Sequence, residues 1–215
     1  MKQKQDFHIA ACLLAAFVLW TAAIRFVDVQ AIGPLGSTVG FAAVNRFVHQ
    51  LTGVHMALYV ITDWLGLVPL AVAMGFGTLG LIQWSRRRHL LKVDHDILIL
   101  GGFYLAVMAA YVLFEQVVVN YRPVLIDGHL EASYPSSTTM LVLCVMPTAI
   151  MQVHARIKNG VFRRCAVFAM NAFIVFMVMG RLISGVHWLT DIIGGALLSA
   201  GLVLMYRAFI RPEAK

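Results

Sequence analysis

The residues of this 215-residue chain that could do chemistry concentrate in one short, otherwise apolar stretch, from Gly180 to Asp191. This stretch places Arg181 six residues before His187, and Asp191 four residues after it. If its second half is helical, His187 and Asp191 lie on one face, where the carboxylate can hold one tautomer of the imidazole. Charged groups at the end of an apolar helix are costly to desolvate, so the stretch indicates a functional site.

Two further polar clusters interrupt apolar runs, Arg122-Pro123 and the segment Pro135–Thr139, which reads Pro-Ser-Ser-Thr-Thr. Taken alone, the arginine is an ordinary interfacial anchor and the segment is an ordinary helix start. Open amides at a helix N-terminus also suit an anion, and two guanidinium groups suit phosphate. With a histidine nucleophile beside a carboxylate, the three clusters together predict phosphoryl chemistry on a lipid.

The composition is that of a membrane protein. The chain is 60% hydrophobic and 13% charged, with a mean hydropathy of +0.82, whereas soluble domains carry about 25% charged residues. Its net charge of +7 does not indicate a nucleic-acid partner, because the basic residues cluster between apolar runs as they do in cytoplasmic loops. Its cysteines show no zinc spacing, and the sequence suggests neither a metal nor another cofactor.

Apolar runs long enough to cross a bilayer predict an all-α polytopic protein with a single membrane domain, 1–215. The six expected spans are residues 8–27, 56–84, 97–119, 135–153, 165–181 and 188–210. The first run could also be a signal peptide, but it lacks a convincing cleavage site, so an uncleaved span is favoured. Residues 33–53, broken by Gly, Pro and Ser, are typical of an amphipathic interfacial helix or a loop.

Six spans place both termini on the same side as the connections after spans two and four. That side carries 13 of the 17 Lys and Arg residues, so the positive-inside rule predicts that it is cytoplasmic. The three polar clusters then meet at the outer face of the plasma or inner membrane. We therefore expect the site between the outer ends of spans three and four and of spans five and six.

The order of these clusters resembles the type 2 phosphatidic acid phosphatase superfamily, whose members are typically six-helix membrane lipid phosphatases. That family's pattern is Lys-x6-Arg-Pro, then Pro-Ser-Gly-His, then Ser-Arg-x5-His-x3-Asp. The chain matches it from about residue 115 to 191, with Gly180 in place of the serine of the third motif. The matching positions are Arg122, Pro123, Pro135, Ser136, Arg181, His187 and Asp191.

The resemblance implies a metal-independent reaction in which His187 attacks phosphorus and forms a phosphohistidine, while Asp191 orients the imidazole. Phosphate oxygens would be held by Arg122, Arg181 and Ser136, and also by Ser137 and Thr138 at the start of the same span. Water would then release the phosphate. The implied ligands are a lipid phosphate or diphosphate and the surrounding membrane lipids.

Two positions depart from the family pattern. Its lysine falls on Glu115, and its second-motif histidine, which protonates the leaving oxygen, falls on Thr138. General acid catalysis raises a rate by about 10² to 10⁴. Protonation of the leaving group matters more when an alkoxide departs than when a phosphate does. A lipid diphosphate, such as a polyprenyl diphosphate, is therefore the favoured substrate over a monophosphate.

Three other polar residues are auxiliary candidates: His129 as a stand-in acid, Glu115 as a partner for an arginine, and Asp63 as an intramembrane carboxylate. Each also has a simpler interpretation, His129 as a solvated loop histidine and the two carboxylates as interfacial groups. Two alternatives to hydrolysis stay open, a lipid phosphotransferase and a catalytically silent relative that binds phospholipid. No protein partner is indicated by the sequence.

Overall fold

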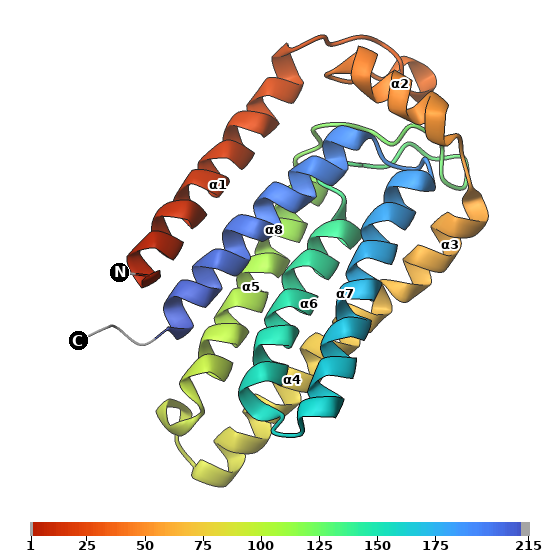
Figure 1. Ribbon diagram of the computed structural model, residues 1–215. Coiled ribbons are helices and arrows are strands. Elements are labelled where there is room, and N and C mark those ends of the chain that lie inside the picture. Colours follow the sequence, from red (N-terminus) through yellow and green to blue (C-terminus); the bar gives the residue numbers. More distant parts are fainter. Residues whose placement is uncertain (1, 212–215) are drawn as a thin grey trace.

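The computed structural model describes residues 2–211, and this part of the chain is helical without β-strands. Six of its helical segments are long and apolar enough to span a membrane, which confirms the predicted fold class (Figure 1). The first span is α1 (Lys2–Phe26), and the second consists of α3 (Met56–Leu65) and α4 (Leu67–Arg87). The others are α5 (His95–Gln116), α6 (Ser137–Arg156), α7 (Gly160–Ile183) and α8 (Leu189–Ile210).

Several helix bounds differ from the predicted ones, for local reasons. Helix α1 begins six residues earlier than expected, and its Asp6 pairs with Arg207 and Arg211 beside the end of α8. Helix α7 begins at Gly160 rather than 165, because the Asn159 side chain caps its first amides. Helix α5 stops at Gln116, three residues early, and α6 begins at Ser137, two residues late.

Residues 33–53, which were expected to form an amphipathic interfacial helix or a loop, contain a helix. Helix α2 (Ala42–Thr52) is amphipathic and lies across the end of the bundle, between α1 and α3 (Figure 1). Its Asn45 is fully buried, donates to the Gly40 carbonyl and Thr190 Oγ1, and accepts from the Thr190 amide. These bonds fix α2 over the start of α8.

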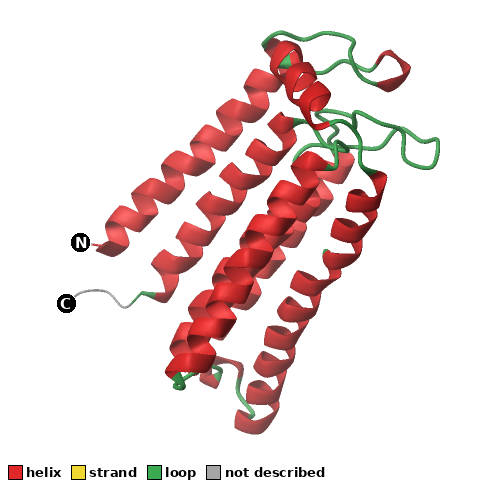
Figure 2. Ribbon diagram, turned by 45° about the vertical axis from the view of Figure 1, so that its right-hand side comes forward, coloured by secondary structure: helices red, strands yellow, loops and turns green. Residues whose placement is uncertain are grey.

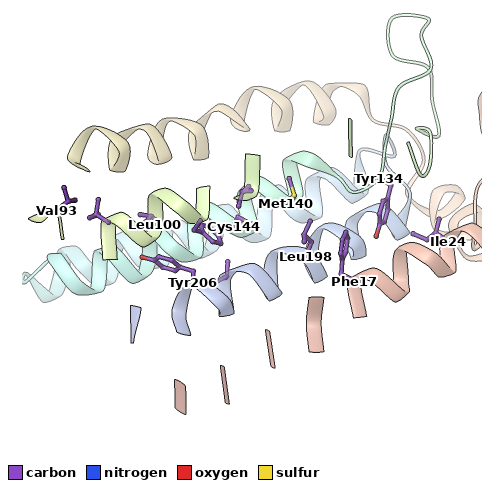
Figure 3. Close-up of a cluster of buried hydrophobic side chains, with 13 residues drawn as sticks. Phe17, Ile24, Val93, Leu100, Tyr134, Met140, Cys144, Leu198 and Tyr206 are labelled. Atoms are coloured by element: carbon purple, nitrogen blue, oxygen red, sulfur yellow. The ribbon is translucent and has the colours of Figure 1, made fainter. Parts of the chain in front are cut away.

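The centre of the bundle is formed by α6 and α8, in which half of the membrane-spanning residues are buried. Helix α8 packs along α1 and α6, while α7 lies against α6 and α3. The main apolar core runs along this seam from Tyr206 through Leu198 to Tyr134 (Figure 3). Close contact depends on Gly194, where a Cβ would lie 2.4 Å from the Tyr134 ring.

The two ends of the bundle carry different connections. Figure 2 shows residues 27–41, α2 and the long loop 117–136 gathered at one end, opposite the termini. The short connections around residues 88–94 and 157–159 lie toward the end that holds the termini (Figure 1). All three polar clusters found in the sequence belong to the end with the long loops.

Candidate functional site

The candidate site is built around His187, which lies in the turn between α7 and α8. This turn requires Gly185, whose φ is +68° and whose Cβ would lie 1.9 Å from the Gly53 carbonyl oxygen. The close approach presses the turn against the connection between α2 and α3. His187 is 3% exposed, so its ring is almost wholly enclosed by protein.

The expected contact between His187 and Asp191 is indirect. Helix α8 begins only at Leu189, so the two residues are not neighbours on a helical face, and His187 Nδ1 lies 3.9 Å from Asp191 Oδ2. Between them is the hydroxyl of Ser133, 3.0 Å from Nδ1 and 2.5 Å from Oδ2. The carboxylate therefore acts on the imidazole through a serine that the sequence reasoning missed.

The hydrogen bonds around Asp191 determine where the protons of Ser133 and His187 lie. The fully buried carboxylate accepts from Asn120 Nδ2 at 3.2 Å and from the Trp188 amide at 2.9 Å, as well as from Ser133. Since Ser133 donates its only proton to Asp191, it must accept from His187, which places the imidazole proton on Nδ1. The lone pair of His187 is then on Nε2, which accepts from Arg181 Nη2 at 3.2 Å.

The electrostatic surroundings keep His187 neutral. Burial, reinforced by the positive charges of Arg122 and Arg181, lowers the pKa of His187 well below its usual 6.5. A neutral imidazole with a free Nε2 lone pair is the nucleophilic form. The arrangement can therefore attack an electrophile without first losing a proton.

The two arginines meet over one aromatic ring that the sequence did not single out. The guanidinium carbon of Arg181 lies 5.0 Å from the ring centre of Tyr59 on α3, and that of Arg122 lies 5.7 Å away. Arg181 also reaches Asp63 at 3.5 Å, and Arg122 Nε lies 3.0 Å from Glu131 Oε2. Both arginines are buried, and Arg122 Nη1 and Arg181 Nε have no hydrogen-bond partner among the described residues.

These groups surround a polar cavity of about 520 Å³. Arg122 and Arg181 line it, together with Ser137 and Thr138 from the first turn of α6. The first amides of α6 have no intrahelical acceptor, so this helix end adds donors to the cavity. A small recess with room for about one water molecule, about 10 Å³, continues from it to His187.

Ser136 does not line this cavity. Its amide donates to the Asp191 carbonyl at 3.1 Å, and its fully buried hydroxyl has no partner among the described residues. The sequence resemblance gave it a phosphate-binding role, whereas the observed contact joins the start of α6 to α8. At this helix start, Ser137 and Thr138 are the residues that line the cavity.

The auxiliary candidates separate into two groups. Glu115 and Asp63 both line the polar cavity, with Glu115 also lining the recess beside His187. His129 is exposed near the tip of the loop, where a turn pairs it with Ile126, and it lines neither the cavity nor the recess. Among the described residues no cluster of three or more His, Cys, Asp or Glu could hold a metal ion.

An apolar groove of about 380 Å³ adjoins the polar cavity. It runs between α4, α5 and α6 and is lined mainly by aliphatic side chains such as Leu70 and Leu141. The groove and the cavity share Asp63, Tyr111, Ser137 and Thr138. A ligand with a polar head and an apolar chain could therefore occupy both.

Known proteins resemble this chain in sequence and in fold. Residues 115–213 match the model of the PAP2 superfamily. The whole chain is similar to the crystal structure of the first transmembrane PAP2 type phosphatidylglycerolphosphate phosphatase from Bacillus subtilis, with 18% identity and a TM-score of 0.59 over 95% of this chain and 98% of that one. No curated protein matches the chain. The region that carries the three motifs is thus similar to the PAP2 superfamily, and the chain as a whole shares the fold of a membrane phosphatase.

Proposed function

We propose that this protein hydrolyses a lipid phosphate at the outer leaflet through a phosphohistidine on His187, and that its substrate is a polyprenyl diphosphate. The observation that carries the proposal is the ordered chain from Asp191 through Ser133 to His187 Nδ1. This chain fixes the lone pair on Nε2, beside the two buried arginines. Such an arrangement suits attack on a phosphorus atom held by guanidinium groups.

The first step forms a bond between His187 Nε2 and phosphorus as the bond from phosphorus to the leaving oxygen breaks. The imidazole becomes positively charged, and Asp191 stabilises this charge through Ser133. Arg122 and Arg181 face the phosphate oxygens, on which negative charge is concentrated in the transition state. When the substrate binds, its oxygens replace the resting contact between Arg181 and Nε2.

The second step restores the enzyme. A water molecule attacks phosphorus, the bond to Nε2 breaks with its electron pair returning to the nitrogen, and both protons of the water leave with the released phosphate. The small recess beside His187 is polar and has room for such a water. Each step then balances without a proton donor other than water.

The leaving group favours a diphosphate. Thr138 lines the cavity where the family pattern has a proton-donating histidine, and a hydroxyl is too weak an acid to replace it. A lipid monophosphate departing from a diphosphate needs no proton, whereas an alkoxide does. The apolar groove beside Thr138 is consistent with a long hydrocarbon chain on the departing part.

The outer-leaflet assignment rests on charge. Of the 17 Lys and Arg residues, the 13 in the termini and in the connections after α4 and α6 favour a cytoplasmic location for those segments. The candidate site is at the opposite end of the bundle (Figure 2). The proposal therefore has both termini inside and the cavity open to the outer surface.

The test is phosphate release from a panel of lipid substrates by the purified full-length protein. We expect undecaprenyl diphosphate to be cleaved faster than phosphatidic acid, with His187→Ala inactive and His129→Ala, an exposed histidine of the outer loop, unchanged. Rapid denaturation at alkaline pH should trap an acid-labile phosphoprotein in the wild type only. Faster cleavage of phosphatidic acid would overturn the substrate, and release by His187→Ala would overturn the mechanism. No release by either protein would favour a lipid-binding role instead.

A further inference from the structure

Hydrolysis of a phosphohistidine on His187 calls for a base beside the attacking water. Water is a weak nucleophile, and a positioned base that takes its proton raises the rate about 10²-fold to 10⁴-fold. His187 cannot serve, because its Nε2 is then bonded to phosphorus and its Nδ1 proton is directed to Ser133. The base must therefore be another group that lines the site.

The polar cavity, with the small recess that adjoins it, is the space open to this water. In an in-line displacement at phosphorus the attacking and leaving atoms lie on opposite sides. Because Nε2 is the leaving atom in the second step, the water takes the place of the departed lipid monophosphate. That place is beside Arg122 and Arg181, which line the cavity.

Three carboxylates in the cavity lining, Asp63, Glu115 and Glu131, can take a proton at neutral pH. The described residues contribute no histidine to this lining, and its hydroxyl groups and two arginines keep their own protons. Asp63 lies 3.5 Å from Arg181, and Glu131 lies 3.0 Å from Arg122. These two carboxylates are thus already engaged by a cation.

Glu115 is the carboxylate that is free to act on water. It is exposed at the end of α5 and forms no ion pair within the described part of the chain. It lines the cavity and also the recess, which has room for about one water molecule and which His187 lines as well. A base can act on a proton within hydrogen-bond reach or through one intervening water, and this placement suits either.

Resting on the proposed function, we infer that Glu115 is the general base for hydrolysis of the phosphohistidine. The water oxygen bonds to phosphorus as the bond to Nε2 breaks, with its electron pair returning to the nitrogen. Glu115 takes one proton from the water during this attack and then passes it to the released phosphate, so the balance of the step is unchanged. The first step does not need Glu115, because a departing lipid monophosphate requires no proton.

The test separates the two steps with undecaprenyl diphosphate radiolabelled in its terminal phosphate. We expect Glu115→Gln to release a burst of lipid monophosphate and to accumulate the phosphoprotein, which is trapped by rapid denaturation at alkaline pH. After removal of the substrate, this phosphoprotein should decay at least about 100-fold more slowly than that of the wild type. The kcat of Glu115→Gln should fall while kcat/KM does not, because kcat/KM reports only the steps up to departure of the lipid monophosphate.

Two variants serve as controls. Glu115→Asp keeps the carboxylate, so its phosphoprotein should decay faster than that of Glu115→Gln. Asp127→Asn, which alters an exposed carboxylate of the outer loop that lines neither the cavity nor the recess, should behave as the wild type.

The outcomes distinguish the inference from the proposed function. Equal phosphoprotein decay in the wild type and Glu115→Gln would overturn the inference alone, as would an equal fall of kcat and kcat/KM without accumulation. Faster cleavage of phosphatidic acid would overturn only the proposed substrate. The decay is then measured with that lipid, because the phosphoprotein is the same whichever lipid departs. Hydrolysis without a phosphoprotein in any of the proteins would overturn the proposed mechanism and the inference together.

Discussion

Replacing Ser133 by alanine tests the central feature of the site, the hydroxyl between His187 and Asp191. The hydroxyl accepts from Nδ1 at 3.0 Å and donates to Asp191 Oδ2 at 2.5 Å, while the direct distance is 3.9 Å. Without it, the imidazole proton loses its acceptor and the charge of the carboxylate is no longer relayed. Asp191 keeps its bonds from Asn120 and the Trp188 amide, so the carboxylate itself should stay in place.

The magnitude follows from the kind of bond that is lost. In the transition state the imidazole becomes positively charged, so its bond to Ser133 is of the charged class, worth about 1.5–3 kcal/mol. At 1.36 kcal/mol per tenfold, kcat should fall about 10-fold to 150-fold. KM should change little, because Ser133 does not line the polar cavity.

The assay is steady-state hydrolysis of the best lipid substrate by purified Ser133→Ala, Asp191→Asn and the double variant. If Ser133 relays the effect of Asp191, the double variant should be only about as slow as the slower single variant, since the two residues act as one unit. Ser199→Ala is the matched control, a buried serine on α8 that donates to the Met140 carbonyl away from the site. Ser133→Thr, which keeps the hydroxyl, should be faster than Ser133→Ala.

Two results would refute this reasoning. One is a folded Ser133→Ala protein with kcat within about twofold of the wild type, which would mean that the hydroxyl contributes less than about 0.5 kcal/mol. The other is a double variant whose loss is the product of the two single losses, which would mean that Ser133 and Asp191 act independently.

Three further predictions test the charge state of His187, the leaving group and the orientation of the protein in the membrane. Because burial and the arginines lower the pKa of His187, kcat/KM should stay constant from pH 8 to below 6.5 and fall only at lower pH, as the imidazole gains a proton. Arg122→Gln should shift this fall in kcat/KM to higher pH. A wild-type kcat/KM that already falls above pH 6.5 would contradict the neutral state assigned to His187. Thr138→His should raise phosphatidic acid hydrolysis about 10²-fold or more with little effect on a diphosphate, and an unchanged monophosphate rate would count against the leaving-group argument. In a background without native cysteines, Asp127→Cys should react with an impermeant maleimide outside intact cells and Arg88→Cys should not, and the reverse pattern would invert the proposed topology.

The sequence by itself determined the membrane class, the spans and the candidate nucleophile. Hydropathy over about 20 residues decides whether a helix can cross a bilayer, so the six spans follow from local composition alone. His187 could be found because its fixed spacing from Arg181 and Asp191 lies within one continuous stretch. Glu115 and Thr138 could likewise be identified as departures from the family pattern by counting along the chain.

Only the tertiary structure decided how these residues act on one another. Ser133 and Tyr59 carry no local signal, because each reaches the site through packing of α3 and the long loop against α7 and α8, far away in sequence. The relay replaces the direct contact predicted from spacing because α8 begins at Leu189, after His187. The meeting of Asp63 and Glu115 at one cavity likewise depends on the tertiary structure, because the two carboxylates come from different spans.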